Sequence, residues 1–599
     1  APAPRPHRRA PMKALLSRLR APDPRRPFTW IVALFVLACL VGFTWDIPCT
    51  DAWHNDSLSP RPCGLGAVVE TWRPGHFFRY PPLQLTLLTL LSLPWIALGA
   101  LRAPAATQQA LLHELIQPRY MTPIEVVART VTLLMAVGVL FNVRRLVARV
   151  WGERAGDAAA AVTALNPVLV YFSHSGNSDI PCLFWVTLGL VELDRVLAGE
   201  ARELRALLCA AAAALTKDQS IPLFFLAAPW ALLVGPALSR GDRTLRSVLL
   251  RPALWRALAA SAGLYLLVAG AVTNPVGYAR RIAWITGPAN ADWVVVGRDL
   301  LGVDAILREV AQAVPLFASR AVALAALLGL GLAVSGRRGV SRVRAALPAV
   351  AALSYLALFI IPSRWTMERH LMPMMVLLLT YVGVAFDALL ERLSPRARPL
   401  GSALLGLALL PQAIDVASVD GTLVLDSRNA AQRFLAALPR GATLEIYGGN
   451  QYLPNLPTHL RITRVGPEPD RERSPLPGVA ESRGAFRDVT QRAPDYALVG
   501  EDFATYYLPT DRPLDPHFAR LNRDPDGRGL MTGLLDGSLG YAWALRSKCE
   551  LPAPLRCVRM HRSIGAETWI FRRARVLAQP DGSPPIELGS SRRSPSAER

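Results

Sequence analysis

The sequence predicts a polytopic α-helical membrane protein with 11 or 13 spans and a small C-terminal extracytoplasmic α/β domain. Apolar residue types make up 52% of the 599 residues and charged types only 19%, against roughly 25% charged in an ordinary soluble protein. The 66 basic and 45 acidic residues give a net charge of +21. The arginines lie between long apolar runs, as they do in the cytoplasmic loops of multispanning membrane proteins. This pattern explains the positive charge better than nucleic-acid binding does.

Residues 1–27 form a basic N-terminal segment with eight Lys and Arg residues against one acid, Asp23. The apolar run 28–45 follows, and about 18 residues suffice to cross a ~30 Å hydrocarbon core. The run is long for a secretory signal, and no small-residue cleavage site follows it. We therefore expect an uncleaved first span and a cytoplasmic N-terminus.

The transmembrane module is expected over 28–416, with a first outer loop at 46–79. Further spans are predicted at about 123–143, 156–173, 180–197, 204–216, 220–238, 257–273, 309–334, 346–361, 370–390 and 399–416. Arginine-rich connections alternate with less basic ones, which places the former in the cytoplasm and the C-terminus outside a bacterial inner (plasma) membrane. The stretch 80–122 is either a surface-lying helix pair or two further crossings, which gives the two span counts.

Residues 417–577 are expected to form the extracytoplasmic soluble domain. Short alternating stretches at 443–447, 461–465, 496–499 and 568–571 predict strands, and 426–438 predicts an amphipathic helix. The Pro-, Ser- and Arg-rich tail 578–599 is expected to be disordered.

Four of the seven cysteines form two local pairs on segments expected outside the membrane. The pairs are Cys49 with Cys63 and Cys549 with Cys557. Disulfides form in that oxidising compartment. Neither pair has the CxxC spacing of a zinc site, so disulfides are the preferred interpretation.

The first outer loop is rich in acids and aromatic residues. Ionisable groups at a membrane edge are costly and therefore candidates for function; solvated loop acids are the alternative. The residues of interest are Asp46, Asp51, Asp56, Glu70, His76, Arg79 and Tyr80.

Two further clusters follow at the outer ends of predicted spans. In YFSHSGNSD, His174 precedes a turn and Asp179 opens the next span, where a carboxylate also suits a helix cap. In LTKDQ, Lys217 is one of only three lysines in the chain and is followed by Asp218. A compact ammonium can bind phosphate, and snorkelling to the interface is the alternative.

A last cluster, SRWTMERHLMP, places Arg364, Arg369 and His370 at the outer edge of a span. Because basic residues concentrate on the cytoplasmic side of membrane proteins, outward arginines favour an anion ligand over a topological signal.

The acidic loop, YPPL, NP…YFSHSGNSD, LTKDQ and RHLMP, in this order, resemble the C-type glycosyltransferases (GT-C). Within these, the chain is most similar to bacterial family 39 proteins, which resemble protein O-mannosyltransferases and the lipid A aminoarabinose transferase. The resemblance covers about 28–416. One departure concerns the first loop, where that family often has Asp-Glu and this chain has Asp51 and Asn55-Asp56.

This resemblance implies an inverting transfer of a hexosyl or pentosyl group from a polyprenyl-phosphate sugar to a glycan, lipid or protein acceptor on the outer face. Asp56, with Asp51 as second choice, is the expected general base, and Asp179 is expected beside the reacting centre. Expected donor phosphate ligands are Lys217, Arg364, Arg369, His370 and His76; expected positioning residues are Tyr80, His174 and Asp218. A divalent cation, Mg or Mn, is the one cofactor left open, and no nucleic-acid partner is expected.

The alternative is a polytopic transporter or lipid flippase, in which the same charges would line a translocation path. Transporters typically show repeated halves with broken helices in matched positions. The sequence has one short pair, 204–216 and 220–238, without a counterpart. A binding or assembly scaffold would leave the outer acids without a task.

Overall fold

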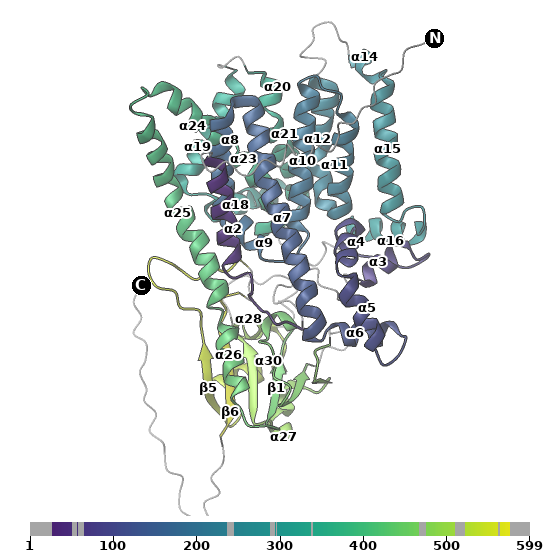
Figure 1. The fold of residues 1–599 in the computed structure, drawn as a ribbon. Coiled ribbons are helices and arrows are strands. Elements are labelled where there is room, and N and C mark those ends of the chain that lie inside the picture. Colours follow the sequence, from purple (N-terminus) through teal and green to yellow (C-terminus); the bar gives the residue numbers. More distant parts are fainter. Residues whose placement is uncertain are drawn as a thin grey trace, which may run out of the picture.

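The computed structural model describes residues 27–50, 57, 65–235, 245–287, 294, 296–336, 340–466, 475–509, 522–560 and 564–574. Within these residues the protein is mostly helical, with one small mixed sheet. Figure 1 shows the helices as an upright bundle, with the sheet domain at one end of it. We call this the domain-bearing end of the bundle.

Apolar helices make up the bundle. They are α2 (Pro27–Leu40), α7 (Pro118–Trp151), α8 (Glu153–Ala164), α9 (Pro167–Ser173), α10 (Asp179–Leu197), α11 (Glu203–Thr216), α12 (Ile221–Pro229), α15 (Pro252–Val268), α19 (Arg320–Ser335), α21 (Leu347–Tyr355), α23 (Glu368–Leu379), α24 (Tyr381–Arg392) and α25 (Arg398–Val424). Shorter or peripheral helices include α3 (Leu65–Trp72), α4 (Pro82–Leu91), α5 (Leu93–Arg102), α6 (Gln108–Leu115), α14 (Leu245–Leu249), α16 (Pro275–Ile285), α18 (Leu300–Phe317), α20 (Arg342–Ala345) and α22 (Ile361–Ser363).

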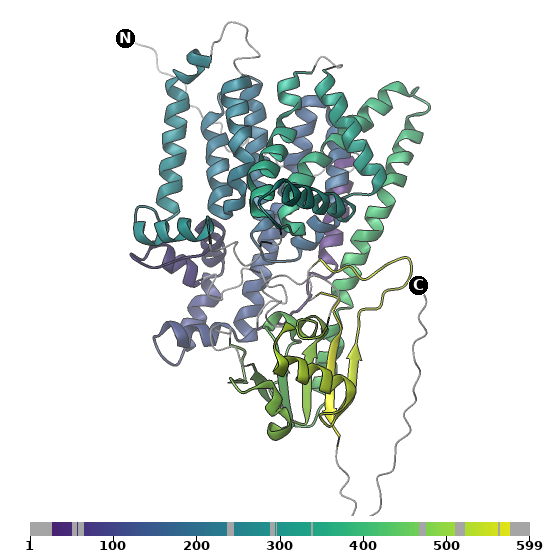
Figure 2. The ribbon, with the colours of Figure 1, turned by 180° about the vertical axis from the view of Figure 1, so that it is seen from behind.

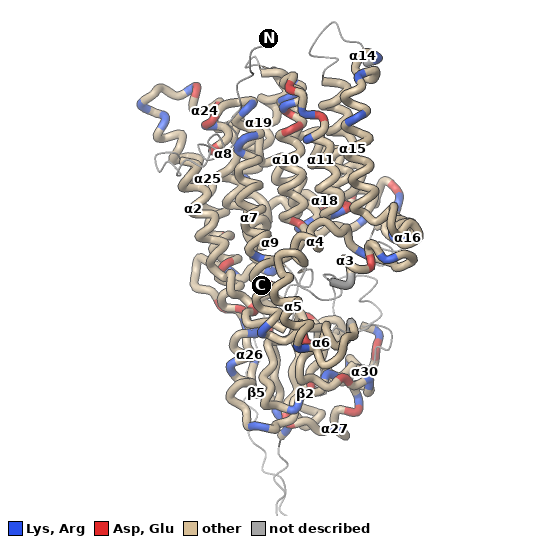
Figure 3. The backbone as a smooth tube through the Cα atoms, turned by 45° about the vertical axis from the view of Figure 1, so that its right-hand side comes forward, with Lys and Arg blue, Asp and Glu red and all other residues tan. Residues whose placement is uncertain are grey.

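Within the described residues, three helices are long and apolar enough to cross a membrane: Pro118–Trp151, Glu368–Arg392 and Arg398–Ala436. The number rises to six if each sharply bent helix pair is one span. Charged residues gather at the two ends of the bundle, whereas its middle is almost free of them (Figure 3). This distribution suits a bundle whose middle lies in lipid.

The predicted single span at 309–334 is wrong, because the chain breaks there into α18 and α19, which meet at 112°. Ala318 is extended and the Ser319 side chain accepts a hydrogen bond from Val322, so a new helix starts at this point. In Figure 2, α18 lies across the bundle rather than along it.

Two other apolar stretches are also bent. The predicted span 156–173 divides into α8 and α9, bent by 65°, because Asn166 caps α9 and Pro167 opens it. In the stretch 80–122, α4 and α5 are bent by 70° and have 10 residues each. Each is about 15 Å long, half of a ~30 Å core, which favours the surface-lying alternative.

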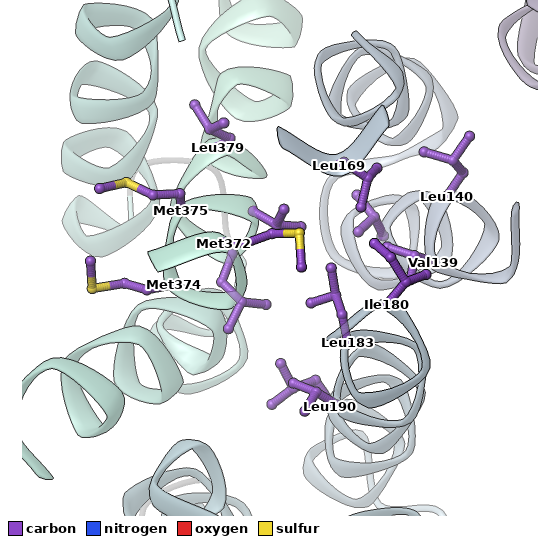
Figure 4. Packing of buried hydrophobic residues seen from close by; sticks show 14 of the residues in the cluster. Val139, Leu140, Leu169, Ile180, Leu183, Leu190, Met372, Met374, Met375 and Leu379 are labelled. Carbon is purple, nitrogen blue, oxygen red and sulfur yellow. The ribbon is translucent and has the colours of Figure 1, made fainter. Parts of the chain in front are cut away.

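Close packing between α7, α9, α10 and α23 forms the centre of the bundle. Figure 4 shows Met372 of α23 facing aliphatic side chains of the other three helices, among them Val139, Leu169, Ile180 and Leu183. Met372 and Leu183 have no exposed surface. This core fixes the start of α10, where the candidate site begins.

The sheet domain contains six strands in the order β3-β2-β1-β4-β6-β5. They are β1 (Thr443–Tyr447), β2 (Arg461–Val465), β3 (Val479–Ser482), β4 (Tyr496–Gly500), β5 (Tyr541–Ser547) and β6 (Thr568–Arg573), with α26 (Ser427–Ala436), α27 (Val489–Arg492), α28 (Glu501–Ala504) and α30 (Pro525–Asp536) as its helices. The first four strands are parallel, and β6 and β5 continue the sheet antiparallel. The four predicted strands and the predicted helix are confirmed; the edge strands β3 and β5 were not predicted.

Candidate functional site

An ion pair between Asp179 and Lys217 lies at the domain-bearing end of the bundle. Asp179 is the first residue of α10, and Lys217 ends α11 in an extended conformation. The side chains are 5% and 18% exposed. Asn177 holds the carboxylate by donating its Nδ2 to Oδ2 at 3.0 Å. The contacts of the Asp179 carboxylate therefore go to Lys217 and Asn177, rather than to a helix cap.

The residue after Lys217, Asp218, also forms an ion pair. Its carboxylate pairs with Arg281 of α16, whose side chain is 1% exposed. The Nε of Arg281 also donates to the Arg79 carbonyl at 3.3 Å. The positioning role expected of Asp218 is thus accompanied by a salt bridge that ties the α11 end to α16 and to the first outer loop.

Asn274 joins the late part of the first outer loop to the start of α16. Its Nδ2 donates to the carbonyls of Glu70 and His76 at 3.1 and 2.8 Å, and its Oδ1 accepts from the Gly75 amide at 2.9 Å. The guanidinium of Arg79 lies 5.3 Å from the ring centre of Trp284. Helix α16 and the loop therefore form one ordered wall.

The α22–α23 corner brings His370 near Lys217. His370 is 2% exposed, and its ring centre lies 4.7 Å from that of Trp365. It lies within electrostatic range of Arg369 and Lys217. Within the described part of the chain, neither His370 Nδ1 nor the buried Tyr355 hydroxyl has a hydrogen-bond partner. Buried polar atoms are normally satisfied, so these two are groups that a ligand could satisfy.

Arg364 occupies an unusual backbone conformation at the same corner. It ends α22 with φ +60°, a region that side chains other than glycine seldom adopt. Its guanidinium is half-buried and forms no ion pair with any residue that the structure describes. Strained residues cluster at functional sites, and this arginine keeps its charge available for an anion.

A second charged cluster, centred on Arg129 of α7, was not predicted. Arg129 is 1% exposed; its Nη2 donates to Asp46 at 2.7 Å and its Nε to Glu125 at 2.9 Å. Both oxygens of Glu125 accept from the Ser57 hydroxyl at 3.0 Å. The signal that could have revealed it is an acid and a base four residues apart in an apolar run, where ionisable groups are costly.

Gly176 links this cluster to the Asp179 turn. A Cβ added at Gly176 would lie 3.1 Å from Ser57 Oγ and 2.7 Å from Ala128 Cβ. Only a glycine fits so close an approach. Ser57 therefore brings the first outer loop against the turn that carries Asp179.

The other predicted site residues are spread around these clusters. Tyr80 packs against a small apolar cluster of Ala67, Leu85 and Leu88, and His76 lies within electrostatic range of Glu70. His174 is buried, with its ring nitrogens 2.8 and 2.6 Å from the carbonyls of Val170 and Val41. The roles predicted for Tyr80, His76 and His174 stay predictions.

Asp51, Asp56 and Cys63 lie outside the described residues, so the predicted base and the Cys49–Cys63 pairing stay predictions. Cys549 and Cys557 are unbonded but share a thiol hydrogen bond. Their disulfide also stays a prediction.

No group of three or more His, Cys, Asp or Glu side chains able to hold a metal ion occurs in the described ranges. The acid of the central pair, Asp179, is already engaged by Lys217 and Asn177. Asp51 and Asp56 lie outside these ranges, so the divalent cation left open by the sequence stays a prediction, and we assign no step to one.

No known protein family and no curated protein matches the sequence. Several solved structures are similar. Apo ArnT from Cupriavidus metallidurans is 14% identical, with 92% of this chain and 99% of that chain covered and a TM-score of 0.44; the form bound to undecaprenyl phosphate gives 15% identity and a TM-score of 0.39 over the same shares.

Two other similar structures are an oligosaccharyltransferase and an arabinofuranosyltransferase. The apo oligosaccharyltransferase of Archaeoglobus fulgidus is 13% identical, with 71% of this chain and 63% of that chain covered and a TM-score of 0.37. This chain thus spans less than two thirds of that protein. AftD from Mycobacteria is 16% identical, with 91% and 40% covered and a TM-score of 0.37. The likeness to these structures is distant, and it assigns no role to any residue of this chain.

Proposed function

We propose that this protein is a membrane glycosyltransferase that moves one sugar from a polyprenyl-phosphate donor to an acceptor on the outer face of the membrane. The observation that carries the proposal is the Asp179–Lys217 pair at the domain-bearing end of the bundle, together with Arg364 at the α22–α23 corner, which forms no ion pair with a residue that the structure describes. A cation that an acid holds in place can stabilise the negative charge of a departing phosphate.

The donor phosphate would enter among positive groups. Arg364 offers a charge that is not neutralised within the described chain, and Lys217 would exchange part of its contact with Asp179 for a phosphate oxygen. Arg369 and His370 lie in the first turn of α23, shortly after Arg364, and would add to the positive charge around the phosphate. These groups would stabilise the negative charge that grows on the phosphate oxygen as the bond to the sugar breaks.

The acceptor would attack from the face opposite to the leaving phosphate, which inverts the anomeric carbon. A carboxylate must take the proton of the acceptor hydroxyl as the new bond forms. We assign this role to Asp56, with Asp51 as second choice. Asp179 would orient the ammonium of Lys217 towards the phosphate, because the ion pair fixes the position of that side chain.

The test is release of polyprenyl phosphate by the purified protein from a panel of polyprenyl-phosphate sugars, with donor binding measured separately. We expect Lys217→Ala to weaken donor binding and to lower turnover, since one charge serves both the bound donor and the transition state. Lys548→Ala is the matched control, because Lys548 is 58% exposed in the sheet domain and pairs with Glu550. Equal activity of the two variants would contradict the proposal.

A transporter or lipid flippase is the second candidate, and the bent pairs α8/α9 and α18/α19 favour it, because broken helices mark many transport sites. Proteoliposomes separate the two functions. Movement of a fluorescent polyprenyl phosphate across the bilayer without sugar release would identify a flippase, and sugar transfer would identify the enzyme.

A further inference from the structure

Trp45 lies where the membrane bundle, the first outer loop and the sheet domain meet. It follows α2 and is only 4% exposed. Its indole Nε1 donates to Asp426 Oδ2 at 3.2 Å, across 381 positions of sequence. Asp426 is separated from α25 by Leu425 alone and caps α26, the first helix of the sheet domain. The indole therefore connects the loop to the corner at which the sheet domain begins.

Two buried arginines lie over the Trp45 ring. Arg129 of α7 is 5.9 Å and Arg428 of α26 is 5.6 Å from the ring centre. Two guanidinium groups so close to one ring would repel each other unless each had its own acid. Arg129 has Asp46 at 2.7 Å, and Arg428 has both oxygens of Asp426, at 2.8 and 2.6 Å. Each of the two guanidinium groups therefore has a carboxylate next to it, Asp46 for Arg129 and Asp426 for Arg428.

The backbone of the loop is also held from both sides. Arg129 Nη1 donates to the carbonyls of Phe43 and Trp45 at 2.8 and 2.7 Å. From the sheet domain, Asn455 Nδ2 donates to the carbonyls of Asp46 and Pro48 at 3.2 and 2.7 Å. Asp46 itself has φ +66°, a conformation that a non-glycine residue adopts only where its surroundings hold it.

We propose that the sheet domain is a positioning element for the transfer reaction, and that Asn455, Asp426 and Arg428 act through the segment 43–48 on the acidic loop that follows it. This inference rests on the proposed function, because its effect is exerted on the carboxylate that accepts the proton. The acids Asp51 and Asp56 follow Pro48 within eight positions of sequence. The sheet domain therefore fixes the segment from which the chain continues to these two acids.

Asn455→Ala is the cleanest probe, because it removes two hydrogen bonds to the loop and leaves the charged groups in place. We expect turnover to fall by about three- to thirtyfold, with donor binding and thermal stability unchanged. Asn429→Ala is the matched control. Asn429 is also half-buried and lines the same hollow as Asn455; among the described residues, its side chain donates to the Val424 carbonyl at 3.2 Å and to no carbonyl of the segment 43–48. Its turnover should equal that of the wild type.

A second measurement separates positioning from general damage. In the Asp56→Asn background, Asn455→Ala should cause no further loss of turnover, because a residue that acts through the base has no effect once the base is gone. A loss equal to that in the wild-type background would overturn the inference. So would wild-type turnover in Asn455→Ala.

A third measurement needs no activity. Hydrogen exchange in a peptide covering 43–50 should accelerate in Asn455→Ala and not in Asn429→Ala. Unchanged exchange would overturn the anchoring. Faster exchange in a protein that transfers no sugar from any donor would support the anchoring and overturn the proposed function, so the two failures are distinguishable.

Discussion

At the scale of single residues, the proposed general base Asp56 is tested by a single substitution. If Asp56 takes the acceptor proton, Asp56→Asn should lower turnover by about 10²–10⁴-fold and leave donor binding nearly intact. The check is single-turnover release of polyprenyl phosphate beside equilibrium donor binding. Wild-type turnover in Asp56→Asn would transfer the role to Asp51, whose Asn variant would then show the loss.

The cysteine pair of the sheet domain gives a prediction on pH. A hydrogen bond from the Cys549 thiol lowers the pKa of Cys557 to about 7, while the same contact and burial raise the pKa of Cys549. The thiolate is the reactive form, so alkylation of Cys557 in the reduced protein should rise through half its maximum near pH 7.

Cys549→Ala is the control for this titration. Without its thiol donor, the pKa of Cys557 should return towards the ordinary 9.0, and the alkylation curve should move to higher pH. Alkylation of Cys557 with the same midpoint in both proteins would show that the contact does not form in solution.

The parts of the candidate site that could be predicted are those in which a single ionisable residue stands out in an apolar sequence. Asp179 and Lys217 stand out because ionisable groups at a membrane edge are costly, and the structure pairs them. Arg129 and Glu125 obey the same rule but lie at the start of a long apolar run, which conceals them. The contact of Trp45 with Asp426 joins residues 381 positions apart, and no local pattern encodes such a contact.

At the scale of elements, the turn between α9 and α10 depends on the absence of a side chain at Gly176. A Cβ there would lie 2.7 Å from Ala128 Cβ, so we expect Gly176→Ala to destabilise the protein by about 1–3 kcal/mol and to lower turnover. The measurement is thermal unfolding in detergent.

The matched control for this variant is Gly529→Ala in α30. Gly529 is exposed in the helix interior and has no atom within 4 Å of a new Cβ, so alanine should stabilise α30 by about 1 kcal/mol at most. An equal fall in stability in both variants would show that the contact with Ala128 does not cause the loss in Gly176→Ala.

Secondary structure was predictable where one face of an element is buried. The strands β1, β2, β4 and β6 alternate or are buried throughout, whereas β3 and β5 lie at the sheet edges with much of their surface exposed. The break between α18 and α19 escaped prediction for a different reason. The runs before Ser319 and after Arg320 are both apolar, and hydropathy reports how apolar a run is but not its direction in space.

At the scale of the whole molecule, the charge distribution predicts that the domain-bearing end faces outward. Ser538→Cys in the sheet domain and Ser394→Cys after α24 are matched probes, because both serines are exposed. We expect a membrane-impermeant maleimide to label Ser538→Cys in intact cells and Ser394→Cys only after permeabilisation. The reverse pattern would contradict the topology and the outer-face mechanism together.

The last helix of the bundle runs almost without interruption into the sheet domain, because Leu425 alone separates the end of α25 from the cap Asp426. With 27 residues, α25 is about 40 Å long, against a ~30 Å hydrocarbon core. A helix longer than the core tilts or protrudes, to an extent set by the acyl chains around it. We therefore expect bilayer thickness to change the tilt of α25, and with it the position of the sheet domain relative to the membrane surface.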